Sequence, residues 1–339
     1  MNADKSRRKV RSAYLRLSAF ICGSILFLCG CGRADSTNEV VLYTSIDQPY
    51  AAAIVKEFEA TTGIEVMLVT DAEATKSVGL AERLRAEKDN PQADVFWSNE
   101  PFHTINLAEE GVLHPYDSPS AKDVPQQFKD PQQRWASNGL RARVIAVGPE
   151  GPRLNSIFDL RDPSLKDRIA MAKPTAGTTG GHVAALYVLW GDEQARKYFK
   201  ELRANGVKLF GGNSVVAQAV ADGSIVAGLT DNDDVAAVAA NGGKIAAILP
   251  DQPAFGTLMV PTTVGLVTGA KRADAGKHLI DYLLSAQVEQ KMLEQKFVGW
   301  SVRDVAEGKA KPMEVDFAQV ARTMPRAVRE ATAILEGRE

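Results

Sequence analysis

The chain has 339 residues, and its 40 lysine and arginine residues against 42 aspartate and glutamate residues give a formal net charge of −2. Six of these basic residues and one of the acidic residues lie in residues 1–30, so the remainder of the chain carries −7. A nucleic-acid-binding protein needs a basic patch, which this acidic composition does not suggest, and we expect no nucleic-acid partner. The length suffices to bury the cores of two lobes.

The first thirty residues predict a signal peptide that is not part of the fold. A basic front precedes the apolar segment LSAFICGSILFLCG, which is too short for an ordinary membrane span. The following LCGC, at residues 28–31, resembles the bacterial lipobox, and this resemblance implies cleavage before Cys31 and a lipid on its sulfur. We therefore expect a protein on the periplasmic side of a bacterial membrane, anchored by lipid. An uncleaved N-terminal anchor is the alternative.

From residue 40 onward, strand patterns alternate with helix patterns. Apolar runs at residues 40–45, 64–69 and 93–98 predict strands, each followed by a helical segment. Further strands are predicted at residues 141–148, 168–172, 224–229 and 244–249, and a helix in the polar tail after residue 301. This alternation predicts an α/β fold with mainly parallel, doubly wound sheets flanked by helices.

Polar residues follow five of the predicted strands. Ligands of parallel sheets bind beyond the carboxyl ends of the strands, so we expect these residues to line one cleft between two lobes. The residues are Ser45 and Asp47; Thr70, Asp71 and Glu73; Asn99 and Glu100; the segment PTAGTTGG at 174–181; and Asp231, Asn232, Asp233 and Asp234.

The acidic run at residues 231–234 has two interpretations. It can cap a helix and supply acidic residues for its first turn, which the helix dipole favours. It can also supply hard oxygen ligands for a cation, or paired carboxylates for an organic cation. An EF-hand is excluded because Ala236 stands where that loop requires glycine. We expect the run to face the opposite lobe, so that a captured guest relieves its charge. Alanine at both Asp233 and Asp234 would then abolish binding without changing the melting temperature of the cargo-free protein.

Several longer motifs resemble solute-binding proteins of bacterial ABC importers, most closely the ferric-ion-binding branch. They are VVLYTSIDQPYAAAIVKEFEATTGIEV, NPQADVFWSNEP, RWASNGLRARV, KPTAGTTGG and ADAGKHLIDYLLSAQVEQ. The resemblance implies a type II periplasmic-binding fold, a monomer whose cleft closes on cargo and docks on an ABC permease. Two crossings, near residues 141–148 and 255–267, would join the lobes. The implied boundaries are a tether at 31–39, lobe one at 40–143 plus 256–300, lobe two at 144–255, and a helical segment at 301–339 packing on a lobe.

The same resemblance implies the cargo site. The branch commonly uses adjacent tyrosines where this chain has Asp233 and Asp234, and an acidic ligand near Asn99, beside Glu100. A histidine present in some members would fall at residues 45–47, where this chain has none. The implied cargo is Fe(III), with a small anion at the 177–180 loop, and no intrinsic cofactor is expected. The candidate ligands are Asp231, Asp233, Asp234 and one of Glu100 or Glu73, with Thr178 and Thr179 for the anion. Thiamine, a polyamine or 2-aminoethylphosphonate are the alternative cargoes.

Other interpretations of single residues stay open. Thr178 and Thr179 can simply cap a strand–helix turn, and Arg141 and Arg143 can form a salt bridge between lobes instead of neutralising a bound anion. Glu100 and Asp233 could act as an acid–base pair. However, the sequence has no nucleophile elbow and no metalloprotease motif, so we expect a binding protein rather than an enzyme. A scaffold lipoprotein is the third class.

Overall fold

The computed structural model describes residues 38–71, 77–175, 177–304 and 310–339. The predicted signal peptide, the predicted lipidation site Cys31, most of the tether and the candidate ligand Glu73 lie outside the described residues. In the described ranges, no helix combines the length and the apolar character that crossing a membrane requires.

The N-terminal third of the fold alternates strands and helices in the predicted order. Helix α1 has Pro49 in its first turn and ends at Gly63, which adopts the left-handed φ of 70° and donates its N–H to the carbonyl of Glu59. The elements are β1 (Glu39–Thr44), α1 (Gln48–Thr62), β2 (Glu65–Thr70), α2 (Val78–Ala86), β3 (Val95–Ser98), α3 (Phe102–Glu109) and β4 (Leu113–His114).

The rest of the chain adds six strands and seven α-helices among the described residues. Short 3₁₀ turns occur at Pro119–Ala121, Gln126–Phe128, Ile157–Arg161 and Pro163–Leu165. The strands are β5 (Ala136–Val147), β6 (Ile169–Ala172), β7 (Lys208–Phe210), β8 (Ala227–Asp231), β9 (Ala246–Ile248) and β10 (Met259–Val267). The helices are α4 (Gly177–Trp190), α5 (Asp192–Ala204), α6 (Asn213–Ala221), α7 (Asn232–Ala240), α8 (Ala273–Leu283), α9 (Ala286–Glu294) and α10 (Phe317–Glu336).

The strands are connected in the order β2-β1-β3-β10-β5-β8-β6-β7, with β4 beside β10 and β9 beside β5. The outer pairs β1–β2, β1–β3, β6–β7 and β6–β8 are parallel, as the strand–helix alternation predicts. The central strands β5 and β10 run antiparallel to their neighbours. The predicted α/β fold with helix-covered, mainly parallel outer strands is therefore confirmed.

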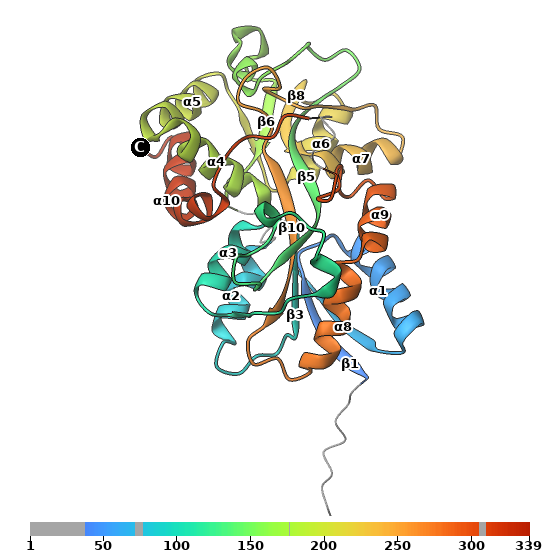
Figure 1. Cartoon of the computed structure of the whole chain (residues 1–339). Coiled ribbons are helices and arrows are strands. Elements are labelled where there is room, and N and C mark those ends of the chain that lie inside the picture. The colour runs from blue at the N-terminus through green and yellow to red at the C-terminus, as the bar shows by residue number, and fades with distance from the viewer. Residues whose placement is uncertain (1–37, 72–76, 176, 305–309) are drawn as a thin grey trace, which may run out of the picture. The chain divides into compact units, whose positions relative to one another are not determined.

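Strand β5 connects the two groups of parallel strands (Figure 1). Its residues 136–142 pair with β10, and its residues 143–147 pair with β8 and β9. The sequence placed the start of this strand at residue 141, so its first five residues were not predicted. The change of partner falls between residues 142 and 143, and the division into two lobes stays a prediction.

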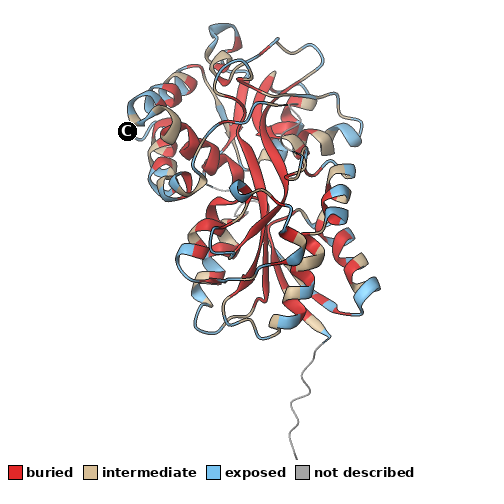
Figure 2. Cartoon of the chain, viewed as in Figure 1, coloured by how far each residue is buried: buried red, intermediate tan, exposed pale blue. Residues whose placement is uncertain are grey.

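Both faces of the first group of strands are apolar because helices cover both (Figure 2). On β3, Phe96 packs in one cluster with Tyr43 and Phe102. Its neighbours Val95 and Trp97 point to the opposite face and join a second cluster with α1 and α8. Each face therefore has its own core, and the strands read as continuous apolar runs.

The C-terminal helix α10 packs against α3, α4 and α5. Its packing includes the ring contact of Phe317 with Phe102, whose centroids lie 6.1 Å apart, and an ion pair between Arg322 and Glu109. Helix α4 also contacts α3 directly, because a Cβ atom placed on Gly181 would lie 1.9 Å from the ring of Phe102. A glycine is required there for the two helices to meet.

We predict that Gly181→Ala destabilises the protein although alanine favours helices. Helix propensity contributes about 1 kcal/mol in favour of alanine, whereas overpacking against Phe102 costs about 1–3 kcal/mol. Urea unfolding followed by circular dichroism measures the difference. Gly211→Ala is the control, since a Cβ there meets no atom within 4 Å. Equal effects of the two substitutions would contradict the proposed contact.

Candidate binding site

The acidic run lies at a strand–helix junction rather than in a loop. Asp231 is the last residue of β8, and Asn232 is the first residue of α7. Asp233 and Asp234 occupy the first turn of α7, where the helix dipole favours negative charge. Asp231 is the N-cap residue, but its side chain makes no capping hydrogen bond to the described backbone. The capping interpretation thus accounts for the position of Asp233 and Asp234 and not for the side chain of Asp231.

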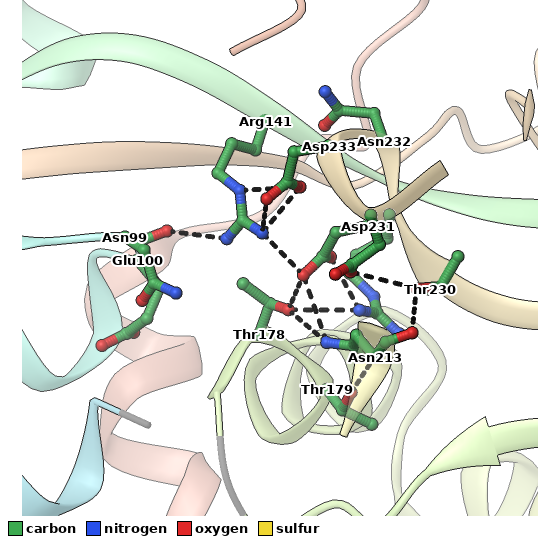
Figure 3. A network of polar contacts seen from close by, with 12 residues as sticks. Asn99, Glu100, Arg141, Thr178, Thr179, Asn213, Thr230, Asp231, Asn232 and Asp233 are labelled. Atoms are coloured by element: carbon green, nitrogen blue, oxygen red, sulfur yellow. Dashed lines mark hydrogen bonds and ion pairs between the residues drawn. The ribbon is translucent and has the colours of Figure 1, made fainter. Parts of the chain in front are cut away.

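The carboxylate of Asp231 is surrounded by donors from three other elements (Figure 3). Its Oδ1 accepts a 2.7 Å bond from Arg143 Nη1. Its Oδ2 accepts bonds of 2.6 Å from Thr178 Oγ1, 3.0 Å from Arg141 Nη2 and 3.1 Å from Asn213 Nδ2. Asp231 itself is 2% exposed. This carboxylate is therefore an internal anion rather than an open ligand.

In the described part of the chain, the carboxylate of Asp233 is paired with the guanidinium group of Arg141. Arg141 Nη2 donates to both carboxylate oxygens of Asp233 at 2.7 Å, and its Nε donates to Oδ1 at 3.1 Å. The same guanidinium donates from Nη1 to the carbonyl of Asn99 at 3.3 Å. Arg141 therefore joins the end of β3 to the start of α7, and the salt-bridge interpretation of this arginine describes the geometry.

These contacts change the expected role of the acidic run. The buried guanidinium groups of Arg141 and Arg143 relieve the charge of Asp231 and Asp233. Removing one partner of a buried ion pair costs about 3–5 kcal/mol. Alanine at Asp233 would remove one of the two carboxylates that pair with Arg141 and leave only Asp231. The variant with alanine at both Asp233 and Asp234 is therefore expected to be less stable than the wild type, contrary to the expectation from the sequence.

The environments of the two buried carboxylates push their pKa values apart. Burial opposes ionisation of Asp231, but Arg143, Arg141 and Thr178 outweigh it and lower the pKa of Asp231 to about 2. Burial raises the pKa of Asp233 to about 6, because Arg141 only partly offsets it and the charges of Asp231 and Asp47 add to it. Burial therefore holds the pKa of Asp233 above its ordinary value, whereas the two arginines hold the pKa of Asp231 below its ordinary value.

Asn232 contacts strand β5, and Asp234 contacts strand β8. The Asn232 side-chain oxygen accepts a 2.6 Å bond from the backbone N–H of Ala142, which fastens α7 to β5. Asp234 accepts a 3.1 Å bond from the hydroxyl of Thr230 and is only partly buried. Asp234 is therefore the one member of the three aspartates that also borders open space.

That space is a cavity of about 780 Å³. Its lining comes from the turn after β1, the start of α1 and the end of β2, and from α6, α7 and the residues that follow α7 and α9. Three partly buried carboxylates, Asp47, Asp71 and Asp234, lie in this lining. The other polar lining residues are Ser45, Gln48, Tyr50, Thr70, Ser214, Asn241 and Gln295. Polar residues from the ends of β1, β2 and β8 thus converge on one cavity.

Glu100 and Asn99 lie elsewhere and have structural partners. The Glu100 carboxylate is fully buried, accepts a 2.6 Å bond from the backbone N–H of Phe102 and caps the start of α3. Figure 3 shows this carboxylate turned away from Arg141. Burial raises the pKa of Glu100. The Asn99 side-chain oxygen accepts bonds from the hydroxyls of Ser45, at 3.1 Å, and Ser77, at 2.7 Å.

The two threonines at the start of α4 also have internal partners. Thr178 donates to Asp231, as described above, and Thr179 donates to Asn213 Oδ1 at 3.0 Å. Both residues are 1% exposed. These hydroxyl donors are therefore committed to side chains of the protein itself.

Sequence reasoning missed Asn213 and Tyr50. Asn213 opens α6 directly after β7, a three-residue strand that is too short to show a strand pattern. Tyr50 lines the cavity from the first turn of α1. Burial, together with the charges of Asp233, Asp47 and Asp234, raises the pKa of Tyr50. The signal that could have identified Asn213 is its place as a polar residue at the start of a helix.

We predict a pH-dependent stability difference between the wild type and Asp233→Asn. Because the folded-state pKa of Asp233 lies above its ordinary value of 3.8, its contribution to stability is complete at low pH and is lost as pH rises through about 6. The free energy of unfolding of the wild type should fall, relative to Asp233→Asn, by about 1–2 kcal/mol between about pH 5 and pH 8. Urea titrations at both pH values measure it. A relative gain would show that Arg141 lowers this pKa instead.

Comparison with known proteins gives one matching family, and its relatives differ in the ligand that their names state. Residues 39–297 match the family described as bacterial extracellular solute-binding protein. The iron uptake protein A1 of Synechocystis sp. is 25% identical over 317 residues, which cover 86% of each chain. The major ferric iron-binding protein of Neisseria meningitidis is 30% identical over 203 residues, 57% of this chain and 59% of that protein.

Solved structures share the fold. The periplasmic binding protein AfuA from Actinobacillus pleuropneumoniae, with fructose-6-phosphate bound, superposes with a TM-score of 0.78 at 22% identity. The match covers 88% of this chain and 98% of that one. At this identity the likeness establishes the type II periplasmic-binding fold. Since the family match spans most of the described residues, the chain belongs to the bacterial extracellular solute-binding protein family.

Proposed function

We propose that this protein is the extracytoplasmic receptor of a bacterial ABC importer, and that it captures ferric iron in the 780 Å³ cavity and delivers it to a permease. One observation carries the choice of a cationic cargo: the carboxylates of Asp47, Asp71 and Asp234 line the same cavity. Binding without turnover is part of this proposal. The lipid anchor on Cys31 and the monomeric state remain predictions from the sequence.

The lining chemistry favours a hard cation. Carboxylate, hydroxyl and amide oxygens are the donors that hard cations prefer. Asp231 and Asp233 are committed to Arg141 and Arg143. We assign the cargo-facing role to Asp47, Asp71 and Asp234 because these three carboxylates lie in the cavity lining. The names of the Synechocystis and Neisseria relatives, an iron uptake protein and a ferric iron-binding protein, support iron as the cargo.

An organic cation is the second candidate, and the size of the cavity favours it. Small-molecule sites occupy about 300–1,000 Å³, and the cavity of about 780 Å³ is within that range. The partly buried ring of Tyr50 lies in the lining. An aromatic face attracts an ammonium group, and the carboxylates would pair with its charge. Thiamine and polyamines carry positively charged nitrogen atoms. 2-Aminoethylphosphonate carries one ammonium group together with a negatively charged phosphonate.

We predict that Fe(III), supplied as its citrate complex, raises the melting temperature of the protein, whereas Ca(II) has little effect. Asp234→Asn should weaken Fe(III) binding by at least about tenfold, since changes around a metal typically cost 10–100-fold in affinity. Differential scanning fluorimetry and competition with a chelator provide the measurements. Asp274→Asn is the control, because its carboxylate is 94% exposed and lies outside the cavity lining. Stabilisation by spermidine or thiamine alone would favour the second candidate, and no stabilisation by any of these would contradict both.

We also predict that the Fe(III) complex lacks a strong visible charge-transfer band. Such a band requires a tyrosinate ligand, whereas the cargo-facing role is assigned to the carboxylates of Asp47, Asp71 and Asp234. Absorption spectroscopy of the loaded wild type, with Tyr50→Phe as the control, gives the answer. An intensely coloured complex that loses its band in Tyr50→Phe would make Tyr50 a ligand.

A further inference from the structure

We infer that the Asp231 carboxylate is a built-in anion, so that this protein binds its cargo cation without a co-bound anion. The part of the inference that concerns a cargo cation rests on the proposed function. The part that places Asp231 in an anion site rests only on the hydrogen bonds and ion pairs of Asp231.

Four side chains converge on this one carboxylate. Arg143 and Arg141 bring two guanidinium groups, at 2.7 Å and 3.0 Å. Thr178 and Asn213 bring a hydroxyl and an amide, at 2.6 Å and 3.1 Å. Guanidinium and neutral N–H or O–H donors of this kind are the groups with which proteins bind phosphate and carboxylate ligands. The arrangement is that of an anion-binding site whose occupant belongs to the chain.

Three helices begin around the same carboxylate. Thr178 is the second residue of α4, Asn213 is the first residue of α6, and α7 begins directly after Asp231. These helices have 14, 9 and 9 residues. The N-terminus of a helix carries partial positive charge and favours an anion within its first turn. The two arginines and the three helix N-termini therefore all favour a negative charge on Asp231.

Most residues of the site offer almost no exposed surface to a second anion, although Asn213 is only partly buried. Asp231 is 2% exposed, Thr178 1% and Arg143 1%. A tethered carboxylate also has a high effective concentration relative to a free anion that competes for the same donors. Bicarbonate, phosphate or a phosphonate group would have to displace Asp231 from a buried position. A metal ion would therefore be bound after release from its solution anion.

Arg143 also has two donor atoms that Asp231 does not occupy. The Nε and Nη2 atoms of Arg143 are buried and have no hydrogen-bond partner among the described residues. A small anion at these two atoms would contradict the inference. The experiments therefore measure anion binding to the wild type directly, as well as to variants.

The first experiment replaces the built-in anion. Asp231→Ala removes the carboxylate and leaves its donors, and Asp231→Asn keeps the shape without the charge. Scanning fluorimetry of the cargo-free proteins is run with sodium formate, bicarbonate and phosphate against sodium chloride at equal ionic strength. We expect both variants to melt below the wild type, and formate to raise the melting temperature of Asp231→Ala only. Absence of this rescue in a folded Asp231→Ala, or equal stabilisation of the wild type, would overturn the inference.

The second experiment needs no variant and covers the case in which Asp231→Ala does not fold. Equilibrium dialysis of the wild type with radiolabelled phosphate or bicarbonate measures the bound anion, with and without Fe(III). We expect no stoichiometric anion in either state. One anion per protein in either state would overturn the inference. If Fe(III) fails to bind, the cargo-free measurements still decide the role of Asp231, so the two proposals fail separately.

Discussion

The burial of two arginines on one strand is the constraint on which the rest of the site depends. Arg141 and Arg143 lie on β5 and are 2% and 1% exposed. A buried charge is tolerated only if it is paired and hydrogen-bonded. The carboxylates must therefore be delivered to β5 by the fold, and this requirement fixes the neighbours of the strand. Arg143 and Asp231 are direct partners in the antiparallel β5–β8 register, so a slip of one residue would turn them to opposite faces.

The same arginines tie distant parts of the chain to β5. Arg141 reaches the carbonyl that follows β3 and the first turn of α7, and Arg143 reaches the first turn of α4. Strand β5 passes from β10 to β8 and β9 between these two residues. The ion pairs thus lie at the point where the strand changes partners. The cavity lies next to this network and shares Asp234 and the α7 helix with it, so the network determines where the cavity wall stands.

Much of the fold could be predicted because its signals are local. The α1 stop at Gly63, the order of strands and helices, and the polar residues at strand ends depend on neighbouring residues only. Strands β4, β7 and β10 and the first part of β5 were not predicted. Strands β4 and β7 have only two and three residues. The first part of β5, ASNGL, is not a strand pattern by itself and pairs with β10, which carries Pro261 in its interior.

The position of the acidic run in the chain could be predicted, but the residues that pair with it could not. The acidic run lies at the end of β8 and the start of α7, close to the predicted strand end, but Arg141 lies 92 positions before Asp233, and no local pattern links them. Glu100 looked like a cleft ligand since it follows a strand, and only the structure shows that it caps the next helix. The sequence pattern therefore identified the polar residues at the edge of the sheet. Which of these residues pair with another part of the protein depends on contacts between distant segments, and these contacts are seen only in the structure.

The position of α10 has a consequence for how fast such a receptor could exchange its cargo. This helix packs on α3, from the predicted first lobe, and on α4 and α5, from the predicted second. Its contacts join the two sides through Arg322 with Glu109 and through Arg326 with Asp192. A hinge motion of the lobes would shear α3 along α10 and break contacts far from the cavity. Residence time of the cargo would then depend on the far side of the molecule as well as on the affinity of the cavity itself.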